Sequence, residues 1–386
     1  MSPWILALLI VSWMVGLWAA GYAAFLGATM IPSFQSWLVY LNRPKPANSK
    51  DLNKPERFGF LHKQVTPFHL LIEDDSDARL YVWHILPLRL YRWNHEELIN
   101  QKFPDRPLSL EEFKQTKNFD LLRHPDTRLV ISLHGAGGHL ASGIRPLSYR
   151  AVSATAADPI HVLAFDYRGF GLSDGKPSES SLLRDAMVVV EWALHVAGIP
   201  PERIVLFGHS LGSAVAIALA NSLTLRTPAI SCAGLVIAGS FTDILTVGKS
   251  RRIFLPIAKI RPWLAYFERH FHSKWVNTHQ IAEFVQESSR YHIAFVHAEN
   301  DPVIPIANAD SLLWHAINAA NENKISEDTT RTRHGEGGRT VEWETKKGAI
   351  FQDIWDRGGH NLILLFPVVE IAILRAFAAA DPDFKF

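Results

Sequence analysis

The sequence predicts an α/β fold with a mostly parallel central sheet flanked by helices. Three short runs rich in aliphatic residues, 129–133, 203–207 and 291–297, are each followed by a polar or glycine-containing loop. Such runs are typical of buried strands. Residues 182–194 carry apolar side chains at helical spacing, which predicts a helix that faces the core. Strands that alternate with helices favour a parallel sheet covered on both faces.

Weaker patterns place the remaining elements. Residues 69–72 and 79–86 favour antiparallel edge strands, and residues 235–238 favour a further strand of the core. Residues 349–355 form another apolar run near the C-terminus, whereas the polar and aromatic stretch 91–125 predicts a loop with a helix. Together these segments complete an α/β domain of about 300 residues.

The apolar run 362–380 has two interpretations. By composition it resembles a membrane span, but Glu370 and Arg375 interrupt it. A helix with one apolar face can instead bury that face against the sheet. We therefore expect a packed C-terminal helix.

Residues 208–212 read Gly-His-Ser-Leu-Gly and join the predicted strand 203–207 to the small-residue run 213–220, which predicts a helix. Strand, Gly-x-Ser-x-Gly and helix in this order are typical of a nucleophile elbow, the sharp turn on which α/β-hydrolases carry their serine. The two glycines let strand and helix approach closely. Ser210 is therefore the candidate nucleophile, and a turn with an incidental serine is the alternative.

A serine hydroxyl becomes a good nucleophile only when a base takes its proton and a carboxylate orients that base. In this fold the acid and then the histidine follow the serine along the chain. Asp301 stands on the loop after the predicted strand 291–297, where the sites of α/β sheets are built. His360 follows two glycines after the run 349–355. Asp301 is therefore the candidate acid and His360 the candidate base.

Each of these two assignments has an alternative. Asp301 precedes Pro302 and fits a simple turn, and Asp243 and Asp356 are rival acids. His360 is one of 18 histidines and fits a surface loop, so its assignment depends on its position and its flanking glycines.

A serine hydrolase also needs donors for the oxyanion of its tetrahedral intermediate. The predicted strand 129–133 runs into residues 134–139, which read His-Gly-Ala-Gly-Gly-His, and a loop at this place can aim a backbone N–H at the developing charge. The second donor is the N–H of Leu211. A phosphate-binding loop is the alternative, but no Gly-x-Gly-x-x-Gly opens a helix here, and residues 248–250 lack the first glycine of a Walker motif.

Residues 165–179 read Phe-Asp-Tyr-Arg-Gly-Phe-Gly-Leu-Ser-Asp-Gly-Lys-Pro-Ser-Glu. This run resembles that of the membrane-anchored serine hydrolases of the α/β-hydrolase domain-containing protein 12 type, which include relatives numbered 13 and 17. The resemblance covers roughly residues 65–380. It implies hydrolysis of lysophospholipids or monoacylglycerols with no metal or organic cofactor. We expect Asp166 and Arg168 to fix the loop beside the site.

The His-Gly-Ala-Gly element is also similar to that of monoacylglycerol lipases, and this resemblance implies that Ala136 supplies the first oxyanion N–H. One feature departs from the family. Between Asp301 and His360 lie 58 residues, more than the family usually shows, and the excess falls in 321–347. The assignment of the triad therefore requires that stretch to be an excursion.

Composition excludes some classes of partner. The net charge is +1 at pH 7 and no basic stripe is present, so nothing favours a nucleic-acid partner. The chain has one cysteine, Cys232, which excludes an internal disulfide and lies near an apolar strand. We expect it to act as a small buried hydrophobic residue.

The N-terminal segment predicts a membrane anchor. No charged residue precedes Arg43, and residues 4–31 are almost wholly apolar, whereas about 20 such residues span a bilayer. A cleaved signal peptide or a buried hairpin are the alternatives, but a basic n-region and a short apolar core are both missing. The stretch also allows two short passes, or a span plus an interfacial helix with Pro32 as the break.

The sequence gives two predictions for the side of the membrane on which the catalytic domain lies. Arg43, Lys45, Lys50 and Lys54 follow the span, so the positive-inside rule places the following domain in the cytosol. The lone cysteine and the absence of an Asn-x-Ser/Thr sequon favour the same side. The family resemblance implies the opposite side of a single-pass protein of the endoplasmic reticulum or another endomembrane. Both orientations stay open at this point.

These segments predict a domain organisation. We expect an anchor over residues 1–41, a linker over 42–64 and an α/β-hydrolase domain over 65–386. Within the domain we expect a helical cap at about 243–285 and a mobile surface loop at about 321–340, which is polar and has no apolar periodicity.

The stretch 243–275 interleaves basic and aromatic residues. It fits a lid over an acyl pocket that touches anionic headgroups, and equally an ordinary helical insertion with a solvated basic face. The sequence as a whole predicts a membrane-anchored serine hydrolase that cleaves esters of a lipid with one acyl chain. The alternatives are a protein depalmitoylase, which uses the same triad on a thioester, and a catalytically silent hydrolase fold that serves as a membrane scaffold.

Overall fold

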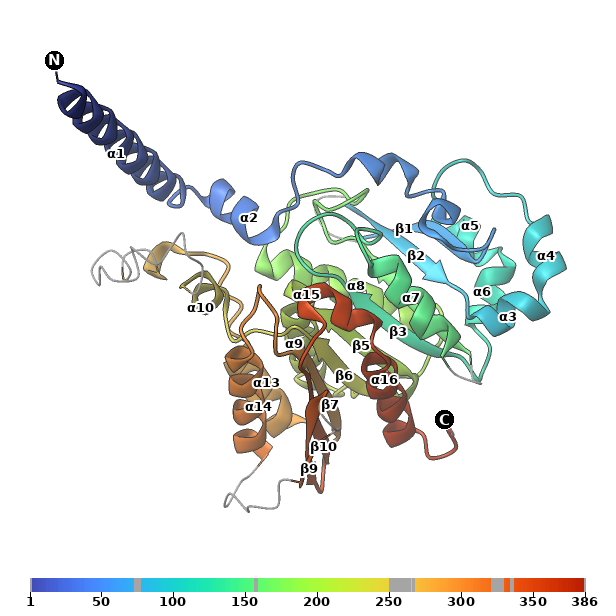
Figure 1. Ribbon diagram of the computed structural model, residues 1–386. Helices are drawn as coiled ribbons and strands as arrows, with labels where there is room; N and C mark the ends of the chain where they lie inside the picture. The colour runs from blue at the N-terminus through green and yellow to red at the C-terminus, as the bar shows by residue number, and fades with distance from the viewer. Residues whose placement is uncertain are drawn as a thin grey trace.

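A mixed sheet of ten strands forms the centre of the protein (Figure 1). The computed structural model describes residues 2–72, 78–155, 159–249, 265, 268–320, 330–333 and 337–384. The strands are β1 (Val65–Leu71), β2 (Arg79–Ile85), β3 (Arg128–Leu133), β4 (Ile160–Phe165), β5 (Ile204–His209), β6 (Gly234–Ala238), β7 (Tyr291–Ala298), β8 (Thr330–Arg333), β9 (Gly338–Thr345) and β10 (Gly348–Trp355). Their order in the sheet is β1-β2-β4-β3-β5-β6-β7-β10-β9-β8.

The six strands from β4 to β10 in this order run parallel, and the strands at both edges pair antiparallel. Every residue of β3, β4, β5, β6 and β7 is buried, which explains why these strands appear in the sequence as continuous apolar runs. The predicted fold class, a mostly parallel sheet flanked by helices, is confirmed.

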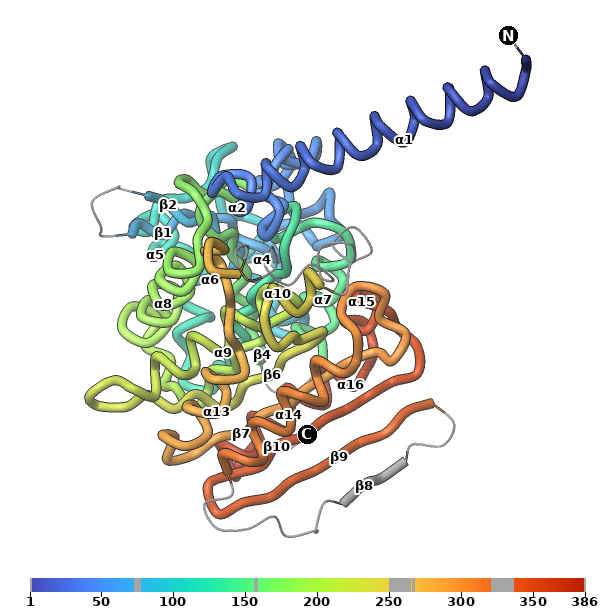
Figure 2. The backbone as a smooth tube through the Cα atoms, turned by 90° about the vertical axis from the view of Figure 1, so that its left-hand side faces the viewer, coloured from blue at the N-terminus to red at the C-terminus, as the bar shows by residue number. Residues whose placement is uncertain are grey.

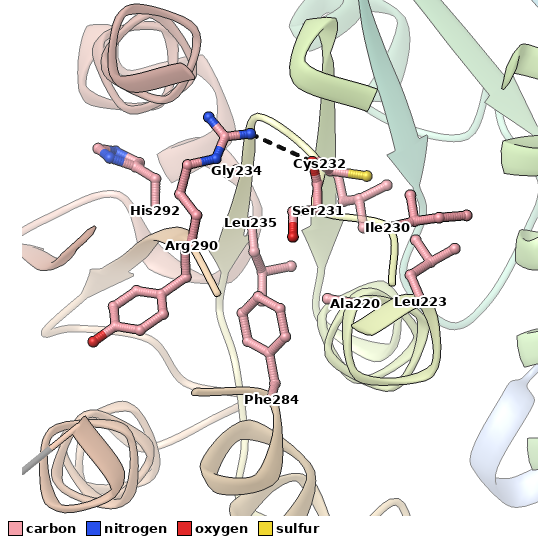
Figure 3. Close-up of a pocket in the computed structure, with 12 residues that line it drawn as sticks. Ala220, Leu223, Ile230, Ser231, Cys232, Gly234, Leu235, Phe284, Arg290 and His292 are labelled. Atoms are coloured by element: carbon pink, nitrogen blue, oxygen red, sulfur yellow. Dashed lines mark hydrogen bonds between the residues drawn. The ribbon is translucent and has the colours of Figure 1, made fainter. Parts of the chain in front are cut away.

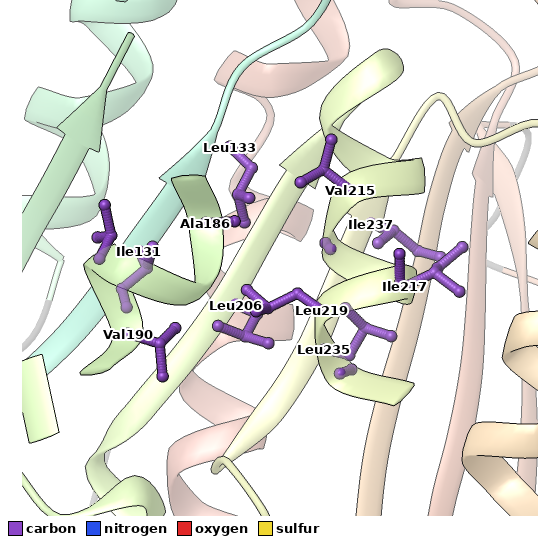
Figure 4. Packing of buried hydrophobic residues seen from close by; sticks show 14 of the residues in the cluster. Ile131, Leu133, Ala186, Val190, Leu206, Val215, Ile217, Leu219, Leu235 and Ile237 are labelled. Atoms are coloured by element: carbon purple, nitrogen blue, oxygen red, sulfur yellow. The ribbon is translucent and has the colours of Figure 1, made fainter. Parts of the chain in front are cut away.

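Helices cover both faces of the sheet (Figure 2). The helices α7 (Arg145–Ala154) and α16 (Pro367–Ala380) pack on one face, and the other face carries α8 (Glu179–His195), α9 (Leu211–Thr224), α13 (Asn277–Glu287) and α14 (Ala307–Ala320). Figure 4 shows Val190 of α8 and Leu219 of α9 packed around Leu206 of β5. This apolar contact fixes α9, and with it the turn that precedes α9.

Short helices make the connections. Between β2 and β3 lie α3 (Leu88–Trp93), α4 (His95–Asn100), α5 (Leu110–Lys114) and α6 (Lys117–Leu122), where the sequence predicted a loop with one helix. The others are η1 (Ala47–Asp51), η2 (Pro55–Phe58), η3 (Pro201–Arg203), α10 (Ile244–Lys249), α15 (Gly359–Leu362) and η4 (Ile363–Leu365).

The C-terminal helix α16 packs against β5, β6 and β7. It buries Val369, Ala372, Ile373 and Phe377 in the apolar cluster on that face. The expectation of a packed helix rather than a second span is confirmed.

The expected loop over 321–340 differs from the structure in its second half. Residues 321–329 and 334–336 lie outside the described residues, but β8 and the start of β9 fall within the stretch and pair antiparallel. β9 then pairs with β10 and turns into it. The alternation of apolar and polar residues along β9 is the period-2 signal of a strand, and the composition of the loop before it obscured this signal. The described part of the excess between Asp301 and His360 thus belongs largely to β8 and β9 at the sheet edge.

The N-terminal segment contains two helices, which differ in their contacts with the rest of the protein. Helix α1 (Pro3–Ala28) projects away from the rest of the protein and has no buried residue, and it is long and apolar enough to cross a membrane (Figure 1). Helix α2 (Pro32–Tyr40) follows a turn and buries Gln35, Val39 and Tyr40.

This arrangement divides the expected anchor, residues 1–41, into two parts, and the bounds at 1–41 and 42–64 stay predictions. α2 packs on the domain through Gln35, Val39 and Tyr40, whereas α1 has no buried residue. The expected linker is also packed: Leu52 is fully buried, and its carbonyl oxygen accepts hydrogen bonds from the Tyr81 hydroxyl and the Trp83 indole N–H. Aromatic and aliphatic residues spread through a polar stretch gave no periodic signal for this packing.

The expected cap over 243–285 is described only at its ends. α10 covers its start, whereas residues 250–264 and 266–267 lie outside the described residues. The last part of the stretch belongs to α13, which packs against α9 and α14 in the layer beside the sheet.

The packing of α2 leads to a stability prediction. Tyr40 is fully buried, its ring meets that of Phe170, and its hydroxyl lies 3.1 Å from Ser273 Oγ. Tyr40→Ala should therefore lower the free energy of unfolding by about 3 kcal/mol, as expected for a buried aromatic side chain. Denaturant unfolding in detergent micelles measures this. Leu8→Ala, at an exposed position of α1, is the control and should stay within about 0.5 kcal/mol of wild type. Equal stability of both variants would show that α2 is only a tether.

Candidate active site

Ser210 occupies the turn between β5 and α9. Its backbone has φ 55° and ψ −120°, a left-handed conformation that a residue with a side chain adopts only when the surroundings enforce it. Glycines on both sides make the turn possible: a Cβ at Gly208 would lie 2.3 Å from the carbonyl oxygen of Gly212, and one at Gly212 would lie 1.9 Å from that of Leu133. The helix thus passes against the end of β3, and the serine side chain projects from the sheet edge.

His360 and Asp301 lie next to this turn. His360 Nε2 is 2.9 Å from Ser210 Oγ, and His360 Nδ1 is 2.8 Å from Asp301 Oδ2. Asp301 stands on the loop after β7, and His360 stands in α15 after β10. The structure therefore brings the three candidate residues into one chain of hydrogen bonds, although 150 positions separate Ser210 from His360.

The surroundings of Asp301 favour its ionised form. Burial raises the pKa of this carboxyl, but the hydrogen bond and charge of His360 and the N–H groups of Ile304 and Val303 outweigh burial, so the pKa is lowered overall. An ionised carboxylate only accepts hydrogen bonds. His360 Nδ1 therefore carries the hydrogen, and Nε2 is left with a lone pair that accepts the hydroxyl proton of Ser210.

The rival acids occupy other places. The Asp243 carboxylate caps the start of α10, because it accepts hydrogen bonds from the backbone N–H and the hydroxyl of Thr246. Asp356 is exposed, and its backbone N–H donates to the carbonyl oxygen of Gly337. Among the described contacts of His360, the carboxylate partner is Asp301.

The loop after β3, residues 134–139, lies against Ser210. A Cβ at Gly135 would stand 3.1 Å from Ser210 Cβ. Within the described part of the chain, the N–H groups of Ala136 and Leu211 have no protein acceptor. Leu211 opens α9, where the first N–H groups have no partner within the helix. Two unsatisfied donors beside a serine hydroxyl are what an oxyanion requires.

The side chain of Arg145 holds this loop from behind. Its guanidinium donates hydrogen bonds of 2.6–3.1 Å to the carbonyl oxygens of Gly135, Ala136, Gly137 and His139. A planar guanidinium with several fixed donors suits such a set of acceptors. Because the carbonyl groups point to Arg145, the geometry of the loop does not depend on the loop residues alone. Nothing in the local sequence signalled this role, since Arg145 lies beyond the glycine-containing motif.

The residues expected to fix the neighbouring loop do so. Asp166 Oδ1 accepts a 2.6 Å hydrogen bond from the N–H of Leu140. Leu140 directly follows the loop 134–139, which is called the oxyanion loop from here on. Arg168 forms an ion pair with the buried carboxylate of Asp185 at 2.6 Å. Both bonds tie the loop after β4 to its surroundings.

His209, the residue before the serine, also contacts His360. Its Nε2 donates a 2.8 Å hydrogen bond to the carbonyl oxygen of His360, and the two rings lie 4.9 Å apart. Burial, with the nearby charge of His360, lowers the pKa of His209 to about 3, so the ring stays neutral at neutral pH. The sequence gave no indication of this role, because position 209 is the variable position of the motif and the contact spans 151 residues.

One hollow lies at the opposite edge of the sheet (Figure 3). Its lining includes Gly234 and Tyr291, the first residues of β6 and β7, and Cys232. Cys232 is half-buried rather than fully buried as expected, and desolvation raises the pKa of its thiol to about 12. In the described ranges, His, Cys, Asp and Glu form no group of three or more that could hold a metal ion.

Comparisons with known proteins show the family and the fold. A model of the alpha/beta hydrolase family matches residues 130–372. The lysophosphatidylserine lipase ABHD12 of Xenopus tropicalis is 30% identical over 71% of the chain and 63% of its own length, and that of Danio rerio is 27% identical over 77% and 69%. The chain therefore spans about two thirds of these relatives. They confirm the resemblance predicted from residues 165–179.

Solved structures show the same fold. An alpha-beta hydrolase from Vibrio vulnificus has a TM-score of 0.52 and 15% identity, and the comparison covers 87% of this chain and 88% of that one. The 2,6-dihydroxy-pseudo-oxynicotine hydrolase has a TM-score of 0.50 and 14% identity, over 84% and 71%. At these identities the likeness concerns the fold alone.

The neutral state of His209 leads to a pH prediction. In the unfolded chain a histidine takes up a proton below about pH 6.5, but folded His209 does so only near pH 3. Its contribution to stability is thus fully present above about pH 6.5 and is lost as the pH falls. His209→Gln should reduce the slope of the unfolding free energy against pH by about 1.4 kcal/mol per unit between about pH 6 and 4. Urea unfolding across this range measures the slope. An unchanged slope would mean that His209 binds protons equally in both states.

Proposed function

Because the chain belongs to the alpha/beta hydrolase family, we propose that it is a membrane-anchored serine hydrolase that cleaves the ester of a lipid with one acyl chain. The observation that carries the proposal is the hydrogen-bond chain from Ser210 Oγ through His360 to Asp301. Ser210 acts as nucleophile, His360 as general base and then acid, and Asp301 as the orienting carboxylate.

The geometry supports a two-step reaction. Ser210 Oγ attacks the ester carbonyl while its proton passes to His360 Nε2, and Asp301 stabilises the imidazolium. The N–H groups of Ala136 and Leu211 bind the oxyanion. His360 then donates its proton to the departing alcohol oxygen, which leaves an acyl group on Ser210. Water, deprotonated by His360, then attacks this acyl-enzyme, and His360 returns the proton to Ser210 Oγ as the fatty acid leaves.

The names of the similar proteins support the proposed class of substrate. Their printed names describe lysophosphatidylserine lipases, so we propose a lysophospholipid as substrate, with a monoacylglycerol as the closest chemical alternative. α1 supports the membrane part of the proposal, because its 26 residues exceed the about 20 that a bilayer requires. We propose a single pass through the endoplasmic reticulum or another endomembrane.

The first test substitutes each residue of the proposed triad in turn. Ser210→Ala should abolish labelling by a fluorophosphonate and hydrolysis of lysophosphatidylserine, since loss of a triad nucleophile costs on the order of 10⁶ in kcat. Asp301→Asn and His360→Ala should also lose nearly all turnover. Asp243→Asn and Asp356→Asn are the matched controls and should keep it. The measurements are labelling and fatty-acid release by the purified full chain.

Other outcomes identify the alternatives. Labelling that persists in Ser210→Ala would assign the nucleophile to another serine. A higher kcat/KM for an S-palmitoyl peptide than for any oxygen ester would indicate a thioesterase. A wild-type protein that neither labels nor turns over any ester would be a scaffold.

The contacts of Arg145 give a second prediction. Arg145→Lys keeps the charge but not the planar set of donors, so the oxyanion loop should shift. We expect kcat to fall about 10-fold while KM changes little, because the loop acts in the transition state. Affinity for a trifluoromethyl ketone, which mimics the tetrahedral intermediate, should fall in parallel. Arg150→Lys in the same helix is the control, since Arg150 donates to Gly59 on the outer surface. A rise in KM alone would contradict this role for Arg145.

A further inference from the structure

Helix α2 is attached to the domain by specific polar contacts. The amide of the buried Gln35 donates to the carbonyl oxygens of Thr29 and His270 at 2.8 and 3.2 Å. Its carbonyl oxygen accepts from the N–H of His272 at 3.3 Å. Ser36 Oγ donates to the carbonyl oxygen of Pro177 at 3.3 Å. These contacts fix the orientation of α2 on the surface of the domain.

The end of α2 reaches the oxyanion loop. The carbonyl oxygen of Tyr40 accepts a 2.8 Å hydrogen bond from the N–H of Gly137, the residue after Ala136. Asn42 Nδ2 then donates to the carbonyl oxygen of Gly169 at 2.9 Å. The segment that leaves the membrane helix is thus one hydrogen bond away from the loop that carries the proposed oxyanion donor.

The aromatic residues of α1 locate the bilayer. Trp4 and Tyr22 are 18 positions apart in α1, which corresponds to a rise of about 27 Å at 1.5 Å per residue. The hydrocarbon core is about 30 Å thick, and Trp and Tyr gather at its two interfaces. Trp18 stacks on Tyr22, with the ring centres 5.4 Å apart. The interface nearer to the domain therefore lies around Tyr22, and the last turns of α1 enter the headgroup layer.

Aromatic contacts continue this interface into α2. The ring of Phe34 lies 6.0 Å from that of Phe25 and 5.3 Å from that of Trp37. Three apolar side chains of this region are exposed: Ile31 by 53%, Trp37 by 39% and Leu41 by 47%. They stand next to a membrane-spanning helix, so the partner that fits them is the headgroup layer of the bilayer that α1 crosses.

We propose that Ile31, Trp37 and Leu41 form an interfacial docking surface that seats α2 in the headgroup layer and holds the oxyanion loop at the membrane. This inference rests on the proposed function and adds how the lipid reaches the site. A lysolipid then moves from the bilayer to Ser210 without crossing water. Tryptophan suits this position because its large apolar ring is exposed, while its N–H already donates to the carbonyl oxygen of Arg43.

The test compares Trp37→Glu with Trp314→Glu in the full chain. Trp314 is 54% exposed on α14, away from α1 and α2 (Figure 1). The enzyme is reconstituted in phosphatidylcholine vesicles that contain lysophosphatidylserine, and a water-soluble acetate ester is assayed in parallel. Trp37→Glu should lower vesicle turnover about 10-fold while acetate turnover changes little, because a charge at this position opposes seating in the interface. Trp314→Glu should leave both turnovers unchanged.

Two further results separate docking from folding. Trp37→Phe loses the hydrogen bond of the indole N–H to the carbonyl oxygen of Arg43 but keeps an apolar ring, so it should keep most of the vesicle turnover. Equal losses on both substrates in Trp37→Glu would overturn the proposal, since they would indicate a damaged domain. Unchanged vesicle turnover would overturn it as well.

A measurement without catalysis makes the proposal independent of the reaction. In a Cys232→Ser background, a nitroxide is attached at Trp37→Cys or at Trp314→Cys, and its collisions with oxygen and with a water-soluble nickel chelate are compared in vesicles. The label at position 37 should collide more often with oxygen than with the nickel chelate, and the label at position 314 should show the reverse. Equal nickel access at both positions would contradict docking, even in a fully active enzyme. An inactive enzyme whose label at 37 favours oxygen would contradict only the proposed function.

Discussion

The rest of the site depends on one backbone constraint, the left-handed conformation of Ser210 between two glycines. The approach of α9 to the end of β3 leaves no room for a side chain at Gly212, because a Cβ there would overlap the carbonyl oxygen of Leu133. This close approach has two consequences. It turns the serine hydroxyl out of the sheet, and it brings the first N–H of α9 next to the loop that follows β3. A single packing contact therefore places both the proposed nucleophile and the proposed oxyanion donors.

The oxyanion loop is held from two sides by partners far apart in the sequence. Arg145 donates hydrogen bonds to the carbonyl oxygens of the loop, and the N–H of Gly137 donates one to the carbonyl oxygen of Tyr40. A glycine-containing loop of this kind is flexible on its own, so its geometry must be supplied by its neighbours. With these groups satisfied, the N–H of Ala136 stays available. Donors fixed in advance stabilise developing charge without further reorganisation, which is the physical basis of their catalytic value.

Local patterns were sufficient to predict most strands of the parallel sheet and to place the three candidate site residues near one another. Ser210, Asp301 and His360 each follow a buried strand, and a parallel sheet brings such positions to one edge. Roles that depend on long-range contacts could not be predicted in this way. His209 meets His360 across 151 positions, and Tyr40 meets Gly137 through main-chain atoms that carry no sequence signature. The packed stretch around Leu52 and the hairpin of β8 and β9 were missed because polar residues surround their few apolar positions.

The two N-terminal helices therefore have different physical roles. α1 has no buried residue, and its apolar surface suits a bilayer at any rotation. α2 has an inner face of Gln35, Val39 and Tyr40 that packs on the protein and an outer face that includes Trp37. A helix with two such faces cannot rotate freely, so it converts the position of the span into a fixed position of the loop above Ser210. In the proposed lipid hydrolase, that constraint would determine which surface of the enzyme meets the substrate before any lipid has bound.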